Sequence, residues 1–221
     1  MVLLSGSAAV AQQRTISARA GSLNYQRGVI FLDGERLRPV FRPPHPVQMQ
    51  NGQVLRVENG RVELVLGMGV YLRMLGPGSL RMQENHLDDA RVAIEQGSAL
   101  IEVAGMMKGA QLRILCGDAI TELRRDGSYR FDAPAQTAPA RLRVFSGEAT
   151  VQRNGITAKA KSGTAMDFES GLVSKIEGND NDALQTWAAQ RSQRRIESER
   201  RRIEALEMRA ARRRAAAESD Q

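Results

Sequence analysis

The chain has 221 residues, of which 42% are hydrophobic and only 4% aromatic, and it carries a formal net charge of +7 at pH 7. This length allows one sizeable core, which must consist mainly of Val, Leu, Ile and Met because aromatic residues are so few. The single cysteine, Cys116, excludes an intramolecular disulfide bond. It lies in an apolar run, and we expect its thiol to be buried and inert.

Residues 1–11 form a short run of small and apolar side chains that ends in Ala9-Val10-Ala11. A small-x-small tripeptide is typical of a signal-peptide cleavage site, but this run is short and lacks a basic region. We therefore expect an incomplete signal peptide and a periplasmic or secreted protein; a plain N-terminal segment and a cytoplasmic protein are the alternative. No other run approaches the roughly 18 apolar residues of a membrane span, so we expect no transmembrane span in the mature chain.

Residues 12–177 are expected to form an all-β domain of many short strands. Asx-Gly pairs, which accept the positive φ angles of tight turns, occur at 33–34, 51–52, 59–60, 126–127 and 154–155. Between the pairs, apolar and polar residues alternate, as at Val62, Leu64 and Leu66, which is typical of strands with one buried face. Such regular spacing favours a β-sandwich, a roll or a short β-solenoid without distinguishing among them.

Two stretches interrupt the strand pattern. Residues 38–46 contain four prolines, which a central strand does not tolerate, so we expect an exposed loop or an edge crossing there. Residues 133–139 predict a second surface connection between two strands.

After residue 177 the pattern changes from strands to a helix. We assign residues 178–190 to a linker and the start of a helix, with Asp182 as its N-cap, and residues 191–221 to an Arg-rich helical tail that runs to about Ala217. Trp187 is expected to dock on the β-domain as a hydrophobic anchor, while the rest of the helix projects into solvent. Residues 196, 203 and 210 repeat every seven positions, with 206 between them, which is too short a pattern to indicate a coiled coil.

Most of the net positive charge lies within residues 191–214 of this tail. The stretch 191–214 contains ten arginines and four glutamates, a net charge of +6, whereas the preceding domain is close to neutral. The candidate polyanion-binding residues are Arg194, Arg195, Arg200, Arg201, Arg202, Arg212, Arg213 and Arg214. One interpretation is a solvated, salt-bridged helix that needs no partner. The other interpretation is a binding element for an anionic envelope polymer, lipid headgroups, an acidic protein or nucleic acid.

The residue types and spacings of the sequence suggest no catalytic constellation. The two histidines, His45 and His86, lie in the proline-rich segment and beside a turn, and we expect both to be solvated rather than to bind a metal. No Ser-His-Asp or Cys-His arrangement is suggested. We therefore expect a protein that is not an enzyme and holds no cofactor.

Several short segments, taken together in their order along the chain, resemble the FecR-type domain family, in particular its exported single-domain members. They are residues 16–21, 29–34, 55–66, 70–74, 76–82, 97–103, 141–149 and 182–184 with Trp187. The resemblance covers roughly 16–191 and implies an all-β roll or short solenoid, a place outside the cytoplasm, and a role in sensing or protein interaction. The best-known members are transmembrane regulators that pass an iron-uptake signal to a sigma factor. This sequence shows neither a cytoplasmic anti-sigma segment nor an internal span, so sigma-factor control is not carried over.

The sequence thus predicts a non-enzymatic, exported module for interaction, sensing or scaffolding in the cell envelope, with a protein or an envelope polymer as partner. The alternative is a cytosolic protein that binds nucleic acid or another polyanion through its Arg-rich helix.

Overall fold

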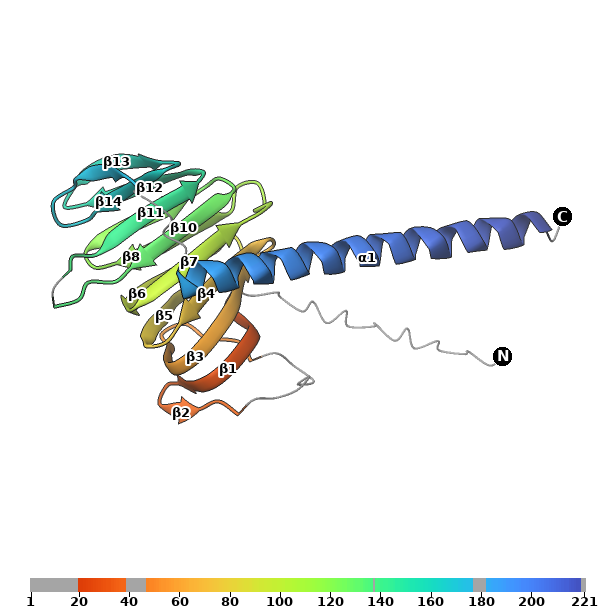
Figure 1. The fold of residues 1–221 in the computed structure, drawn as a ribbon, viewed down its shortest axis with the longest axis horizontal. Coiled ribbons are helices and arrows are strands. Elements are labelled where there is room, and N and C mark those ends of the chain that lie inside the picture. The colour runs from red at the N-terminus through yellow and green to blue at the C-terminus, as the bar shows by residue number, and fades with distance from the viewer. Residues whose placement is uncertain (1–19, 39–46, 137, 177–181, 220–221) are drawn as a thin grey trace, which may run out of the picture.

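Fifteen β-strands followed by one helix make up the part of the chain that the computed structural model describes, which is residues 20–38, 47–136, 138–176 and 182–219 (Figure 1). The elements are β1 (Ser22–Leu32), β2 (Glu35–Arg36), β3 (Val54–Gly67), β4 (Val70–Leu75), β5 (Gly78–Asn85), β6 (Asp89–Gln96), β7 (Ser98–Val103), β8 (Gln111–Cys116), β9 (Ala119–Leu123), β10 (Gly127–Asp132), β11 (Arg141–Ser146), β12 (Glu148–Arg153), β13 (Ile156–Lys161), β14 (Thr164–Asp167), β15 (Val173–Lys175) and α1 (Ala183–Ser219). The predicted fold class, an all-β domain followed by a C-terminal helix, is confirmed.

The strands form one curled sheet. Its order is β13-β12-β9-β8-β6-β5-β3-β4-β7-β10-β11-β14-β15, with β1 paired to β3 and β2 paired to β1. All neighbours are antiparallel except β6 and β8, which are parallel. Strand β13, at one end of this order, also contacts β11 and β14 close to the other end. The sheet is therefore nearly closed. Among the architectures that the sequence left open, the structure therefore selects a roll (Figure 1).

Strand β3 pairs with different neighbours along its length on the side away from β1. Its first part, Val54 to Val57, pairs with β5, and its second part, from Arg61 to Gly67, pairs with β4. The Asn59-Gly60 pair lies between these parts, inside the strand, so the prediction of a tight turn there is wrong. Glycine is needed for a different reason: a Cβ on Gly60 would lie 2.0 Å from the carbonyl oxygen of Arg27 on β1.

The other Asx-Gly pairs do lie at turns or bends. Asp33-Gly34 joins β1 to β2, and Asn154-Gly155 joins β12 to β13; both residues of each pair have positive φ angles, as a two-residue hairpin requires. Asn51-Gly52 lies in the turn before β3, and Asp126-Gly127 lies at the bend where β10 begins.

The interior of the roll is aliphatic, as the composition predicts. Val62, Leu64 and Leu66 point inward from β3 and are at most 1% exposed, and the core also takes in Tyr129. Cys116 is buried as expected. Burial and the nearby Asp132 carboxylate raise the pKa of its thiol to about 12, so it is protonated at neutral pH.

Several predictions fall wholly or partly on segments that the structure does not describe, among them the predicted linker, of which residues 178–181 lie outside the described residues. Residues 1–11 with the expected signal peptide, most of the proline-rich stretch, and His45 lie outside the described residues. The stretch 133–139 is described apart from residue 137, and it is a surface connection between β10 and β11 in which Ala135 and Ala138 form a bridge.

The helix begins where the sequence predicts. The backbone N–H of Gln185 donates to Oδ1 of Asp182 at 3.0 Å, which confirms Asp182 as the N-cap. Helix α1 then continues without a break through residues 190 and 191 to Ser219, and its C-terminal part extends well beyond the roll (Figure 1).

Candidate functional site: the helix dock

The first turns of α1 pack against the outer face of the sheet. Leu184, Trp187 and Ala188 are each at most 5% exposed and form an apolar cluster with Leu100 of β7. Tyr25, Leu75 and Phe145 pack around the edge of this cluster. The prediction that Trp187 anchors the helix to the β-domain is therefore confirmed.

Next to this apolar cluster, three charged side chains from neighbouring strands lie together on the same outer face. Glu63 of β3 and Arg73 of β4 are direct cross-strand partners, and Glu102 of β7 lies diagonally across from Arg73. Side chains in such positions reach one another across a sheet. The Nε atom of Arg73 donates to Glu63 at 2.6 Å, and its Nη1 atom donates to Glu102 at 2.7 Å.

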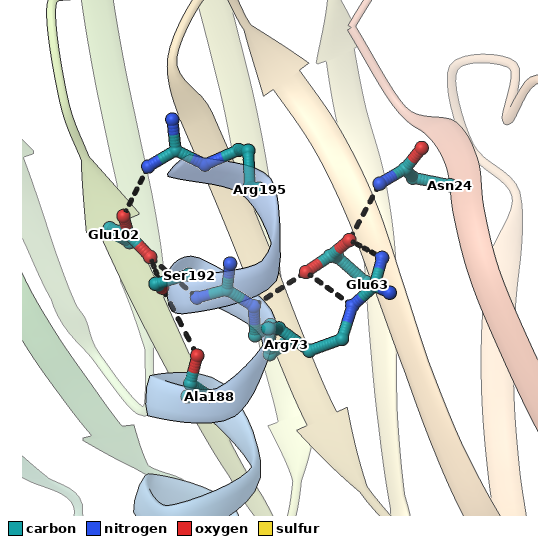
Figure 2. A network of polar contacts seen from close by, with 8 residues as sticks. Asn24, Glu63, Arg73, Glu102, Ala188, Ser192 and Arg195 are labelled. Atoms are coloured by element: carbon teal, nitrogen blue, oxygen red, sulfur yellow. Dashed lines mark hydrogen bonds and ion pairs between the residues drawn. The ribbon is translucent and has the colours of Figure 1, made fainter. Parts of the chain in front are cut away.

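Helix α1 supplies the second half of this network (Figure 2). Arg191 donates to Glu63 through Nη2 at 2.5 Å, and Arg195 donates to Glu102 through Nη2 at 2.7 Å. The hydroxyl of Ser192 also bonds Glu102. We call the seven residues Glu63, Arg73, Glu102, Trp187, Arg191, Ser192 and Arg195 the helix dock.

The dock places charge where water is excluded. Arg73 is fully buried and Glu63 is 2% exposed, while Glu102 keeps limited access to solvent. Burial of an ion is tolerated only when it is paired and hydrogen-bonded. Glu63 satisfies this condition with three donors, since Asn24 of β1 also donates to it at 2.6 Å.

Aromatic side chains flank the charges that come from the helix. The guanidinium carbon of Arg191 lies 4.7 Å from the ring centroid of Tyr25, and that of Arg195 lies 4.8 Å from the ring centroid of Tyr71. These distances are within the range of cation–π attraction. The same face of the sheet therefore holds both arginines by a carboxylate and by an aromatic ring.

The electrostatics of the dock keep both carboxylates ionised. Burial acts to raise the pKa of Glu63, but the hydrogen bonds from Arg191 and Arg73 outweigh it, so this pKa lies below its ordinary value. Burial likewise opposes ionisation of Glu102, and the bonds from Ser192 and Arg73 lower its pKa overall. The helix is thus docked through charges that persist throughout the neutral range.

A second ion pair fixes the N-terminal end of the helix. Asp182, the N-cap, pairs with Arg130 of β10, whose Nε atom also lies 2.9 Å from Oδ1 of Asp132. Burial acts to raise the pKa of Asp182, but the backbone N–H of Gln185 and the Arg130 guanidinium lower it overall. The helix is therefore tied to the sheet at Asp182 and again at Arg195, about 20 Å apart along its axis.

The arginines selected from the sequence separate into distinct environments. Arg195 belongs to the dock. Arg194 lines a cleft of about 350 Å³ between the helix and β1, β3 and β4. Arg200 and Arg201 pair along the helix with Glu204 at 2.8 Å and Glu197 at 3.7 Å.

The remaining arginines lie farther along the helix. Arg202 and Arg212 are exposed, as is Arg209, which the sequence-based selection did not include. Arg213 and Arg214 belong to α1, but only their backbone, and not their side chains, is in the described part of the structure.

The sequence did not single out the three sheet residues of the dock. Glu63, Arg73 and Glu102 occupy the polar positions of alternating strands, a pattern that predicts exposure to water. Only the pairing of β4 with β3 and β7 brings them together, and only the helix covers them.

No other candidate centre is assembled in the described ranges. His86 is 67% exposed at its side chain and lies 3.8 Å from Glu84. Within these ranges, no group of three or more His, Cys, Asp or Glu side chains could hold a metal ion. Among the described residues, no helix combines the length and apolarity needed to cross a membrane.

Comparison with known proteins gives a likeness to solved structures only. No family model matches the chain, and no curated protein matches it. Two crystal structures of a candidate anti-sigma factor from Parabacteroides distasonis align with TM-scores of 0.46 and 0.47 and sequence identities of 16% and 17%. In each alignment, 57% of this chain covers 60% of the other chain. Membership of the FecR-type family remains a prediction.

Proposed function

We propose that this protein is a non-catalytic interaction module of the cell envelope. In this proposal the β-roll is a rigid base, the dock fixes the start of α1, and the part of α1 beyond Arg195 is the element that binds a partner. The placement outside the cytoplasm is supported by the sequence of residues 1–11 and by the FecR-type resemblance.

The observation that carries the proposal is the abrupt change in burial along α1. Up to Arg195 one face of the helix is covered by the sheet, whereas every described side chain from Ile196 to Arg212 is exposed. These include large apolar side chains: Ile196, Ile203, Leu206 and Met208 are 49% to 61% exposed. Of these, Ile203 and Leu206 are three residues apart and are neighbours on one side of the helix, and an exposed apolar patch marks an interaction site.

The physical argument for a presented element rests on the dock. The part of α1 after Arg195, residues 196–219, is 24 residues long and spans about 36 Å. An isolated helix gains little stability unless one of its faces packs against other parts of a protein. Here the first turns pack on the sheet and supply the helical nucleus, so the remainder continues from a fixed end and in a fixed direction. A base of this kind lowers the entropic cost of binding at the exposed part.

A second candidate function is polyanion binding. Among the described side chains, no hydrogen bond or ion pair involves Arg202, Arg209 or Arg212, and all three are exposed. Unpaired arginines spaced along one helix favour phosphate-rich or sulfate-rich partners. This function predicts binding to a labelled DNA duplex or to heparin that weakens steeply with salt and is lost when all three are replaced by Gln.

The proposed function can be tested by crosslinking in the native cell. A photoreactive phenylalanine analogue replaces Ile203, and a control carries it at Leu172, which is also apolar and is 66% exposed on the β-domain. We expect a defined protein adduct from position 203, resistant to nuclease, and none from position 172. The adduct should appear in the periplasmic or secreted fraction.

Two results would contradict the proposal. Absence of any adduct at position 203, or identical adducts at both positions, would remove the helix as the binding element. Recovery of the protein solely from the cytoplasm would refute the envelope location.

A further inference from the structure

Part of the exposed apolar surface of α1 forms a stripe along one side of the helix, with Glu199 between its first two apolar residues. Ile196, Ile203, Leu206 and Ala210 are separated by seven, three and four residues, which places them on one side of the helix. The stripe is about 21 Å long. The sequence pattern alone was too short to indicate a coiled coil. The structure adds that these residues are helical and that their side chains are exposed.

The borders of this stripe are mainly basic. If Ile203 occupies the first apolar position of a heptad and Leu206 the second, the flanking positions are held by Arg200, Arg202, Arg209 and Glu207. In paired helices these flanking positions select the partner by charge. Three of the four are arginine, and Arg202 and Arg209 form no ion pair among the described side chains.

The same charges disfavour a second copy of this chain as the occupant. In an antiparallel pair that places Ile203 against Leu206 of the other copy, Arg202 would lie beside Arg209 of that copy. In a parallel pair, Glu199, which occupies a seam position, would face its own counterpart. Each arrangement also forms a complementary contact with Glu207 of the other copy, through Arg200 in the antiparallel pair and through Arg202 in the parallel pair. The antiparallel pair nevertheless sets Arg202 against Arg209, and the parallel pair buries two glutamates in its seam, and these like charges disfavour self-pairing.

A lipid surface also fits poorly. The stripe holds only three large apolar side chains and no aromatic ring, and Glu199 and Glu207 lie in or beside it. Insertion into a bilayer interface requires a larger apolar face that is free of acidic groups.

We infer that the stripe binds an amphipathic helix of another protein, whose apolar seam is bordered by Asp or Glu. The acidic borders would pair with Arg202 and Arg209, and a basic residue in the partner's seam would neutralise Glu199. This inference rests on the proposed function, because it names the class of partner that the presented helix takes.

The test uses the full chain and two synthetic helical peptides as probes. Both have a leucine seam with one central lysine; one peptide carries Glu at every flanking position and the other carries Lys. Fluorescence anisotropy of the labelled peptides measures binding. We expect the acidic peptide to bind about tenfold tighter than the basic peptide, with a preference that decreases at high salt.

Two sets of variants separate this site from general electrostatic attraction. Arg202→Glu/Arg209→Glu should reverse the preference between the peptides. Arg201→Glu/Arg212→Glu makes the same change in net charge on the opposite side of the helix and should leave the preference in place. The β-domain is remote from these exposed positions, and an unchanged Trp187 emission in both variants verifies that the dock is intact.

Several outcomes would overturn the inference. Equal binding of the two peptides, or binding of neither, would do so. So would a dimer of the peptide-free chain, measured by sedimentation, that the double variant Ile203→Asp/Leu206→Asp abolishes. Binding to anionic phospholipid vesicles that requires Ile203 and Leu206, without peptide binding, would assign the stripe to lipid instead. If the peptides fail while the crosslink at position 203 persists, the presented helix stands and only the partner class is wrong.

Discussion

Replacing Arg73 by methionine tests whether the charges beneath α1 are effectively buried. Arg73 has a side-chain exposure of 1% and bonds two carboxylates, Glu63 at 2.6 Å and Glu102 at 2.7 Å. Methionine keeps much of the apolar volume but removes the cation, which leaves both carboxylates with fewer donors. Removal of one partner from a buried ion pair costs about 3–5 kcal/mol.

The assay is urea unfolding, followed in parallel by far-UV circular dichroism and by the fluorescence of Trp187, the single tryptophan of the chain. For a protein of this size, a loss of about 3–5 kcal/mol corresponds to a fall of roughly 6–20 °C in the melting temperature. The matched control is Arg200→Met, because Arg200 pairs with Glu204 at a side-chain exposure of 80% and such surface pairs contribute less than about 1 kcal/mol. Equal effects of the two substitutions would refute the argument that burial makes the Arg73 pairs different.

Three further predictions concern pH, backbone geometry and thiol chemistry. Both dock carboxylates have pKa values below the ordinary glutamate value of about 4.3. The stability that they contribute is therefore complete above that pH and is lost as the pH falls through the lowered pKa values. Trp187 emission should shift to the red only in that acidic range, and a transition centred near pH 6 would contradict this prediction. Gly60→Ala should lower the free energy of unfolding more than Gly155→Ala, because a Cβ at position 155 would meet nothing within 4 Å. The change at position 155 should therefore cost only the strain of a positive φ, about 1–2 kcal/mol. Equal losses of stability in urea titrations would show that the contact with Arg27 relaxes. Cys116, with a pKa of about 12 and 1% exposure, should react with a disulfide reagent only as fast as the protein unfolds, and rapid reaction of the native protein would show that the thiol is accessible.

The sequence predicted features that depend on neighbouring residues. The two-residue alternation at Val62, Leu64 and Leu66 identified the buried face of a strand, because side chains of a strand point to opposite faces in turn. Asp182 was identified as an N-cap because its side chain bonds a backbone N–H only three residues away. The all-β class, the C-terminal helix and the anchoring by Trp187 follow from patterns of this range.

The same reasoning did not identify the dock, and it misassigned one glycine pair. An Asx-Gly pair predicts a turn from its own conformational freedom, but Asn59-Gly60 lies within a long strand because another strand, β1, passes against it. Likewise, Glu63 is an ordinary polar residue of an alternating strand until Arg73 lies opposite to it and Arg191 covers it from 128 positions further along the chain.

The sequence by itself therefore determined that an all-β region is followed by a C-terminal helix, and where the net positive charge is concentrated. The tertiary structure decided that the strands form one curled sheet, that a buried ion-pair network holds the helix, and which arginines remain free of it. The physical reason is range. Capping and alternation act over a few residues, whereas the burial and pairing of a charge depend on strand register and on segments that are distant in the chain.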